Sequence, residues 1–310
     1  MINRIVRILT NKPTQITKPI FAKEFNKHNK QIKDLEILLN QVDEKSKTYI
    51  ENDIKKMKYG IIGENNIYYE LKNSFIPMVC LHDIRIEYKT FVAQIDFIVI
   101  TTKCIYVIES KNLIGDILVT ENGEFIRYKK DINDNIIAKE GMYSPIIQNE
   151  RHINILSELL KDKLSYKHKL KRIQSLVVIA NAKTIVEKEC APKEVSDKIV
   201  KYDHLISLIS SVEKNKNIDW VFTEEDMMSI SNCLIENHKE KEIDYVKKYS
   251  LNNIENKESI KIINKDCVRS KLKKFRLNKS KEEDVKAYMI FNNETMEEII
   301  NLMPRNFNYN

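Results

Sequence analysis

The chain has 310 residues, of which 42% are hydrophobic, and 52 Lys and Arg against 45 Asp and Glu give a formal net charge of +7 at pH 7. No segment holds the roughly 18 uninterrupted apolar residues of a membrane helix, and the N-terminal apolar run is too short for a secretory signal, so we expect a cytoplasmic protein without membrane contact. The positive charge favours a polyanionic partner, although an abundance of lysine explains part of it.

The N-terminal part of the chain is predicted to be helical. Apolar residues recur at roughly helical spacing, which predicts a polar helix over residues 20–58. The residues of this stripe are Phe25, Ile32, Leu35, Leu38 and Leu39. Gly60 and Gly63 then interrupt the pattern, and a second helix is expected to begin at residue 63. We therefore assign residues 1–57 to an N-terminal helical extension.

A β-sheet is predicted from Pro77 onward, where β-branched runs with period-2 alternation replace the helical pattern. The expected strands lie within residues 78–88, 94–100, 105–111, 116–130 and 174–181. Asn122-Gly123 marks a tight hairpin turn, and apolar spacing predicts a helix over about 146–162 that packs on the sheet. The predicted fold class is therefore α/β, with a mixed central sheet flanked by helices.

Charged residues interrupt the most hydrophobic predicted hairpin. A four-residue turn at 101–104 would place Asp96 directly opposite Glu109 in the antiparallel register. Strand alternation then divides the hairpin into two faces. One face carries Gln94, Asp96, Glu109 and Lys111, and the other carries Ile95, Phe97, Ile108 and Ser110.

Two opposed carboxylates in a sheet repel each other and need a compensating charge. A hard divalent cation supplies it, because Mg²⁺ accepts one or two carboxylates together with substrate phosphate and water. Lys111 would then orient or deprotonate the attacking water and offset charge on the phosphate. The alternative is a solvated strand end at which Lys111 only forms a salt bridge with Asp96 or Glu109.

Four motifs follow one another along the chain: GIIGE at 60–64, QID at 94–96, ESKN at 109–112 and SPIIQNERHINIL at 144–156. In this order they resemble the NERD family, the nuclease-related domain of the PD-(D/E)XK nuclease superfamily. The resemblance implies a restriction-endonuclease-like fold, and we assign residues 58–212 to this domain. Ser144 stands where the family usually has Asn, and Cys104 occupies a turn position where Gly is common.

The resemblance also implies a role for each motif residue. Asp96 and Glu109 would be metal ligands, with the backbone carbonyl of Ser110 as a third, and Lys111 would be the catalytic lysine. The full catalytic set implied by the resemblance is Glu64, Asp96, Glu109, Lys111 and Gln148.

The accessory residues of this set could also serve the structure alone. The resemblance implies that Glu64 holds water or a second cation near the metal and that Gln148 contacts the substrate phosphate or fixes the geometry of the site. A carboxylate near a helix start is also stabilised by the helix dipole, which would account for Glu64 without catalysis. Gln148 could simply begin or cap its helix. His152 is expected to be a polar neighbour of the site or a satisfied core residue, and not a ligand.

The C-terminal part of the chain resembles a second family. Residues 213–264 are charge-rich and are expected to form a helical linker region. Residues 270–304 then resemble the start of an HRDC domain, a small helical module of helicases and RNase D-like enzymes, through an L-x-x-F-R helix and the segment AYMIF at 287–291. About half of such a domain precedes the end of the sequence, and we assign residues 265–310 to this partial, helical module.

A basic run without acidic residues opens this module and is a candidate nucleic-acid-binding surface. Its members are Arg269, Lys271, Lys273, Lys274, Arg276, Lys279 and Lys281. Such a run can neutralise phosphates independently of nucleotide sequence. The alternative is a solvated helix face.

The leading hypothesis is a Mg²⁺-dependent nuclease, with Mn²⁺ as a substitute, that hydrolyses DNA in processing, repair or defence. A non-catalytic DNA-binding or adaptor protein with the same fold is the second hypothesis, and a nuclease acting on RNA is the third. A helicase or another protein is a candidate partner.

Overall fold

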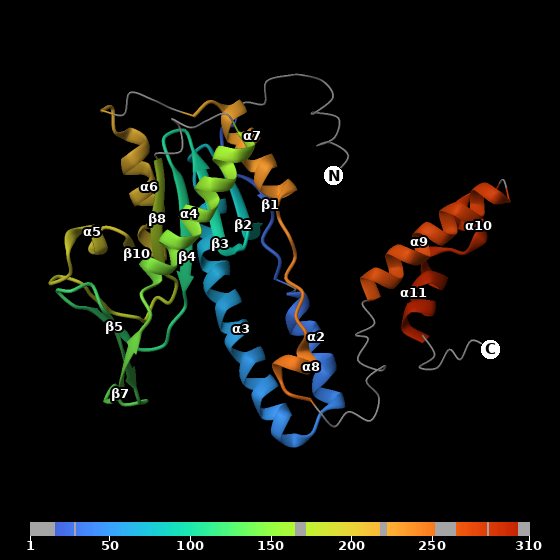
Figure 1. Cartoon of the computed structure of the whole chain (residues 1–310), viewed down its shortest axis with the longest axis horizontal. Helices are drawn as coiled ribbons and strands as arrows, with labels where there is room; N and C mark the ends of the chain where they lie inside the picture. The colour runs from blue at the N-terminus through green and yellow to red at the C-terminus, as the bar shows by residue number, and fades with distance from the viewer. Residues whose placement is uncertain are drawn as a thin grey trace.

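The computed structural model describes residues 16–27, 29–164, 172–217, 222–251, 265–283 and 285–302. Within these ranges the strands form two mixed sheets (Figure 1). The six-stranded sheet has the order β1 (Ile20–Lys23), β2 (Met78–Tyr88), β3 (Phe91–Thr101), β4 (Ile105–Lys111), β8 (Ile173–Ile179) and β10 (Ile199–Lys201). The four-stranded sheet has the order β7 (Ile136–Met142), β6 (Phe125–Lys130), β5 (Asp116–Val119) and β9 (Val186–Glu187).

Helices flank the sheets and occupy both ends of the described chain, which confirms the predicted α/β class. They are α2 (Lys30–Leu38), η1 (Leu39–Gln41), α3 (Glu44–Lys72), α4 (Pro145–Lys163), α5 (Lys193–Ser196), η3 (Tyr202–His204), α6 (Leu205–Lys214), α7 (Glu224–Glu236), α8 (Tyr245–Lys248), α9 (Lys265–Glu282), α10 (Ala287–Ile290) and α11 (Asn293–Leu302). The helices α10 and α11 pack against α9. In the part of the chain that the structure describes, no helix is long and apolar enough to cross a membrane.

Two apolar cores cover the two faces of the six-stranded sheet. On one face, Ile98 and Val107 of the sheet pack with Leu156 of α4 and Leu234 of α7. On the other face, side chains of α3 and α6 complete the core, and its members include Ile67, Leu71, Phe97, Tyr106, Ile108 and Ile209. Because β3 and β4 are buried on both faces, they read as nearly continuous apolar runs.

The long apolar strands and the central helix were predicted correctly. The segments 78–88 and 105–111 coincide with β2 and β4, and 94–100 lies within β3. The helix predicted over 146–162 is α4. The connection at Asn122-Gly123 is longer than the predicted tight turn, because β5 ends at Val119 and β6 begins at Phe125.

The helix predicted over residues 20–58 is wrong in two respects. Ile20–Lys23 form the parallel edge strand β1, whose central residues are buried against β2. The helix α2 begins only after Asn29, whose side chain accepts a hydrogen bond from the Gln31 amide at 2.8 Å, as N-cap residues do.

The predicted interruption at Gly60 and Gly63 is also wrong. The helix α3 runs without a break from Glu44 to Lys72, through both glycines and through the boundary expected at residue 57. Each glycine costs a helix interior only about 1 kcal/mol, which the packing of Ile67 and Leu71 in the core offsets.

The predicted linker is helical in α7 and α8, while residues 218–221 and 252–264 lie outside the described residues.

Candidate active site

The candidate site lies where β3 and β4 diverge. Their antiparallel pairing covers residues 97–100 of β3 and 105–108 of β4, in the predicted register. Beyond this point β4 continues its pairing with β8, while β3 pairs only with β2. The sequence predicts that Asp96 and Glu109 form a pair across the two strands, and this prediction is wrong. They are the first residues of each strand past the point of separation. We call this part of the sheet the open end.

Asp96 bridges the gap between the two strands. Its Oδ2 accepts a hydrogen bond from the backbone N–H of Ser110 at 2.7 Å, so the carboxylate replaces the missing backbone partner of β4. Burial raises the pKa of Asp96 well above its usual range, and the charges of Glu109 and Glu64 raise it further, against the Ser110 hydrogen bond and the charge of Lys111. A carboxyl group in these surroundings favours either a proton or a bound cation.

Glu109 is almost completely buried, with 4% of its surface exposed. Its Oε1 accepts hydrogen bonds from Lys111 Nζ at 2.6 Å and from Gln148 Nε2 at 2.9 Å. The predicted proximity of Lys111 to Glu109 is thus confirmed, and in this arrangement the lysine neutralises the buried carboxylate.

Glu64 reaches the site from α3 because of the glycine that precedes it. A Cβ atom on Gly63 would lie 2.5 Å from Cβ of Asn112, just beyond β4, and 3.0 Å from Cβ of Ala180, so a glycine is required where α3 approaches the sheet. Glu64 Oε2 lies 2.7 Å from Nε2 of His82. Since Glu64 lies well inside α3 and not near its start, the helix-dipole explanation for this residue is wrong.

Gln148 and Asn149 connect α4 to the same strands. The side chain of Ser144 caps α4, so Gln148 is not the cap and is free to donate to Glu109. The neighbouring Asn149 is fully buried and donates to the carbonyl of Val107 at 2.7 Å, which fixes α4 against β4. Asn149 was not predicted as a site residue, because an asparagine in a helix carries no distinctive sequence signal.

Two buried polar atoms near Glu109 have no hydrogen-bond partner in the described residues: Ser110 Oγ and His152 Nδ1. Burial lowers the pKa of His152, while the charge of Glu109 raises it. The electrostatic coupling of His152 to Glu109 and Lys111 agrees with the expected polar neighbour of the site, whereas its unpartnered Nδ1 contradicts a satisfied core residue.

The carboxylates of the open end have free oxygens that fit a divalent cation. Each of Glu64, Asp96 and Glu109 has one oxygen in a hydrogen bond and a second oxygen without a partner among the described residues. However, no three His, Cys, Asp or Glu side chains in the described ranges are arranged as a group that could hold a metal ion. Carboxylate oxygens are the type of ligand that Mg²⁺ prefers, and Mg²⁺ commonly takes one or two of them while substrate and water complete its coordination.

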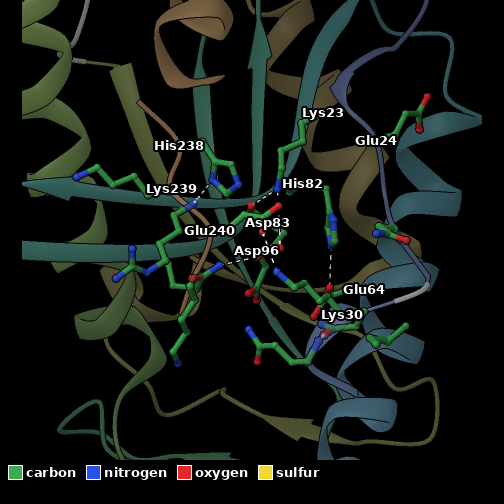
Figure 2. Close-up of a pocket in the computed structure, with 17 residues that line it drawn as sticks. Lys23, Glu24, Lys30, Glu64, His82, Asp83, Asp96, His238, Lys239 and Glu240 are labelled. Carbon is green, nitrogen blue, oxygen red and sulfur yellow. Dashed lines mark hydrogen bonds and ion pairs between the residues drawn. The ribbon is translucent and has the colours of Figure 1, made fainter. Parts of the chain in front are cut away.

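A polar cavity of about 500 Å³ opens beside Asp96 and Glu64 (Figure 2). Its other walls come from the segments 23–26 and 29–31, from β2 and from the segment 238–241. Sequence reasoning missed these walls, because residues more than 200 positions apart meet here only through the fold. The cavity is lined by Lys23, Glu24, Asn26, Asn29, Lys30, Gln31, Ile61, Glu64, His82, Asp83, Arg85, Gln94, Asp96, His238, Lys239, Glu240 and Lys241.

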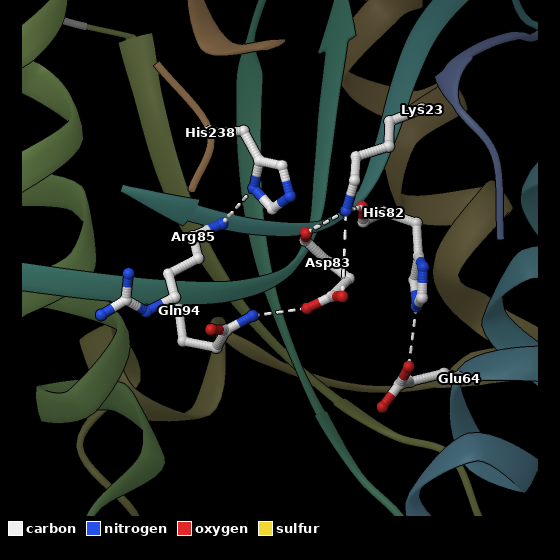
Figure 3. Close-up of polar contacts among 7 residues, drawn as sticks. All are labelled: Lys23, Glu64, His82, Asp83, Arg85, Gln94 and His238. Carbon is white, nitrogen blue, oxygen red and sulfur yellow. Dashed lines mark hydrogen bonds and ion pairs between the residues drawn. The ribbon is translucent and has the colours of Figure 1, made fainter. Parts of the chain in front are cut away.

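The predicted division of the hairpin into two faces is wrong at Ile95. This residue packs in the core beside α4, whereas Phe97 packs in the opposite core. The alternation breaks because Asp83, in the neighbouring strand β2, has the left-handed backbone conformation, with φ of 54°, and does not pair with Asp96. Gln94 donates to the Asp83 carboxylate, which holds both residues at the cavity (Figure 3).

The basic run on α9 divides into two groups. Arg269 forms two hydrogen bonds of 2.6 Å with Glu297 of α11, Arg276 donates to the carbonyl of Phe291 at 3.1 Å, and Lys279 pairs with Glu282 at 3.2 Å. These contacts stabilise the packing of the C-terminal helices or neutralise the run. The exposed members are Lys271, Lys273, Lys274 and Lys281.

Two known protein families match separate parts of the chain. Residues 59–180 match the nuclease-related domain, and residues 267–308 match the HRDC domain. No curated protein and no solved structure matches the chain. The first match contains the open end with Glu64, Asp96, Glu109 and Lys111, and the second contains α10 and α11 with most of α9. The resemblance to the NERD family, with an HRDC-like segment after it, is thus confirmed over residues 59–180 and 267–308.

Proposed function

We propose that this protein is a nuclease of the PD-(D/E)XK type that hydrolyses DNA with the aid of Mg²⁺, for which Mn²⁺ can substitute. The observation that carries the proposal is the convergence of Asp96, Glu109 and Lys111 at the open end, beside a polar cavity. A buried carboxyl group such as Asp96, whose pKa is raised by burial and by the charges of Glu109 and Glu64, is unfavourable for a purely structural sheet and is common at catalytic sites.

Asp96 and Glu109 would hold the cation, with the Ser110 carbonyl as a further ligand. When bound, the cation would polarise the phosphate and lower the pKa of a water molecule. Lys111 would exchange its contact with Glu109 for one with the attacking water or the phosphate, because the cation then balances the charge of Glu109. Gln148 would hold Glu109 in place during this exchange.

A non-catalytic nucleic-acid-binding protein is the second candidate function. The observation in its favour is that Lys111 already neutralises Glu109, so the buried carboxylate has a partner without any cation. In that case the NERD domain would contribute a binding surface, and neither Mg²⁺ nor Mn²⁺ would bind.

A cleavage assay separates the two functions. Plasmid, linear and single-stranded DNA, and RNA of matched sequence, are incubated with the protein with and without Mg²⁺ or Mn²⁺. We expect metal-dependent cleavage of DNA that Lys111→Met abolishes and that Lys139→Met, which changes an exposed lysine on β7, leaves unchanged. Cleavage of RNA but not of DNA would identify RNA as the substrate in place of DNA.

The Lys111 variant needs a second control. Removing Lys111 leaves the buried Glu109 charge unpaired, which destabilises proteins by about 3–5 kcal/mol. The double variant Lys111→Met/Glu109→Gln removes that charge and should regain stability in urea unfolding without regaining cleavage. Binding of DNA without cleavage and without metal affinity in the wild type would establish the non-catalytic function.

The exposed lysines of α9 are proposed to bind phosphates. Changing Lys271, Lys273, Lys274 and Lys281 to Gln should weaken DNA binding and reduce its dependence on salt. The slope of log K against log salt should fall by about 0.7–0.9 for each phosphate that a lysine no longer neutralises. The arginines of the run are unsuitable for this test, because they stabilise the C-terminal helices.

A further inference from the structure

The cavity beside the candidate active site is completed by residues from outside the matched nuclease-related domain. The match covers residues 59–180, whereas the walls at 23–26, 29–31 and 238–241 come from the segments on either side of it. The domain alone therefore leaves the cavity open on these sides, and the added walls determine which groups face a ligand there.

The segment 238–241 is held in place as an addition to β2. The N–H of Lys239 donates to the carbonyl of Arg85 at 3.0 Å, and His238 forms an antiparallel bridge with Ile86. The β1 strand pairs with β2 only around residues 79–81, so the two segments cover different parts of the same strand. The position of His238 is therefore fixed by backbone contacts and does not depend on a mobile side chain.

The hydrogen bond to His238 also determines which ring nitrogen carries a proton. The backbone N–H of Arg85 donates to Nδ1 of His238 at 3.0 Å, so Nδ1 must be unprotonated (Figure 3). In the neutral ring Nε2 then carries the hydrogen, and it has no acceptor among the residues that the structure describes. Burial and the charge of Lys23 lower the pKa of His238, against the charges of Asp83 and Glu240, which agrees with a neutral ring. His238 thus presents a hydrogen-bond donor at the cavity.

Lysines accompany this donor on the same segment. Lys239 is 2.9 Å from Glu87, whereas Lys241 has no ion-pair partner within the described ranges. Lys30, on the facing wall, lies 3.5 Å from Glu240 and is largely exposed. Lys23 differs, because it donates to the carbonyl of His82 at 2.9 Å and to that of Asp83, which makes it a structural residue.

The chemistry of the lining points to a backbone phosphate as the ligand. Among the lining residues the only aliphatic side chain is that of Ile61, and the only aromatic rings are those of His82 and His238, which are both in hydrogen bonds, so polar groups dominate the described walls. The segment 238–241 carries the donor of His238 and the cation of Lys241, while its one carboxylate, Glu240, lies 3.5 Å from Lys30. This segment lies across the cavity from Asp96 and Glu64 (Figure 2). A phosphate bound by His238 and Lys241 would share this cavity with the phosphate that is proposed to be cleaved at Asp96.

We propose that His238 and Lys241 form a phosphate-binding subsite that positions the nucleic-acid strand next to the bond to be cleaved, without recognising its bases. This inference rests on the proposed function for the meaning of the bound phosphate. The binding itself is independent of cleavage, so the two can fail separately.

The test measures binding of fluorescein-labelled single-stranded DNA by anisotropy in EDTA, with the full chain carrying Gln at the exposed lysines of α9. His238→Asn keeps an acceptor for the Arg85 N–H and removes the Nε2 donor, and Lys241→Gln removes the cation. The double variant should bind oligothymidine and a mixed sequence about tenfold more weakly, to the same extent, and with a smaller salt slope. Lys247→Gln makes the same charge change six residues further along, outside the cavity.

Each outcome decides the inference. Affinity of the double variant equal to that of Lys247→Gln would overturn it, and so would a loss confined to one nucleotide sequence. If His238→Asn does not unfold like the wild type in urea, Lys241→Gln alone decides, with a loss of affinity and of salt slope expected. If the double variant binds DNA more weakly but the wild type never cleaves DNA, the proposed function is refuted and the subsite is retained. If the wild type cleaves DNA but the double variant binds it as tightly as the parent protein, the subsite is refuted and the proposed function is retained.

Discussion

The two ends of the β3–β4 pair use the same strands for opposite purposes. At the paired end, Ile98 and Val107 are fully buried, and every rung joins apolar residues. At the open end the strands separate, and Asp96 and Glu109 occupy the next positions. Asp96 accepts a hydrogen bond from the backbone N–H of Ser110, and Glu109 accepts one from the side chain of Gln148. The comparison shows how a stable apolar ladder can support a destabilising charged site one residue away.

The largest expected effect on stability lies at the paired end. Ile98→Ala should lower the free energy of unfolding by about 2–5 kcal/mol, because it leaves a cavity in a core that α4 and α7 close. Urea unfolding measures this, with Gln94→Ala as the control, since Gln94 is an exposed residue of the same strand. Equal losses in the two variants would show that the paired end does not carry the stability assigned to it.

At the open end, a substitution should lower activity without lowering the stability of the fold. Asp96→Asn retains an acceptor for the Ser110 N–H and removes a charge that burial, Glu109 and Glu64 all disfavour. Its free energy of unfolding in EDTA should equal or exceed that of the wild type, while metal-dependent DNA cleavage should fall about 100-fold or more. A clear loss of stability together with normal cleavage would mean that Asp96 is a structural residue.

The two glycines of α3 allow a matched comparison within one helix. Gly63→Ala would place a Cβ against Asn112 and Ala180 and should destabilise the protein by about 1–3 kcal/mol, with α3 and Glu64 displaced from the site. Gly60→Ala meets nothing closer than 3.9 Å and should stabilise the helix by about 0.5–1 kcal/mol. Thermal unfolding measures both, and shifts of the same sign would contradict the close approach of α3.

The paired end was more predictable from the sequence than the open end. Alternating and continuous apolar runs gave the strands and their register, because the period-2 pattern is local. Motif order brought Glu64, Asp96, Glu109, Lys111 and Gln148 together correctly, although their catalytic roles remain predictions. The break in alternation at Asp83 was not predictable, because an aspartate with positive φ looks like any other strand residue. The cavity wall at 238–241 was missed because its pairing with β2 is a tertiary contact.

The smallest expected effect concerns this wall and depends on pH. In the folded protein the pKa of His238 is lowered from 6.5, so between the lowered value and 6.5 the unfolded chain binds more protons than the native one. Stability contributed by the neutral ring is therefore complete above about pH 6.5 and declines as the pH falls through the folded pKa. His238→Asn lacks this titration while every other group is retained, so the difference in unfolding free energy between wild type and variant should shrink from pH 8 to pH 5. A difference that stays constant over this range would mean that the cavity wall holds His238 equally well with its ring charged, and that the hydrogen bond from Arg85 does not fix the neutral form.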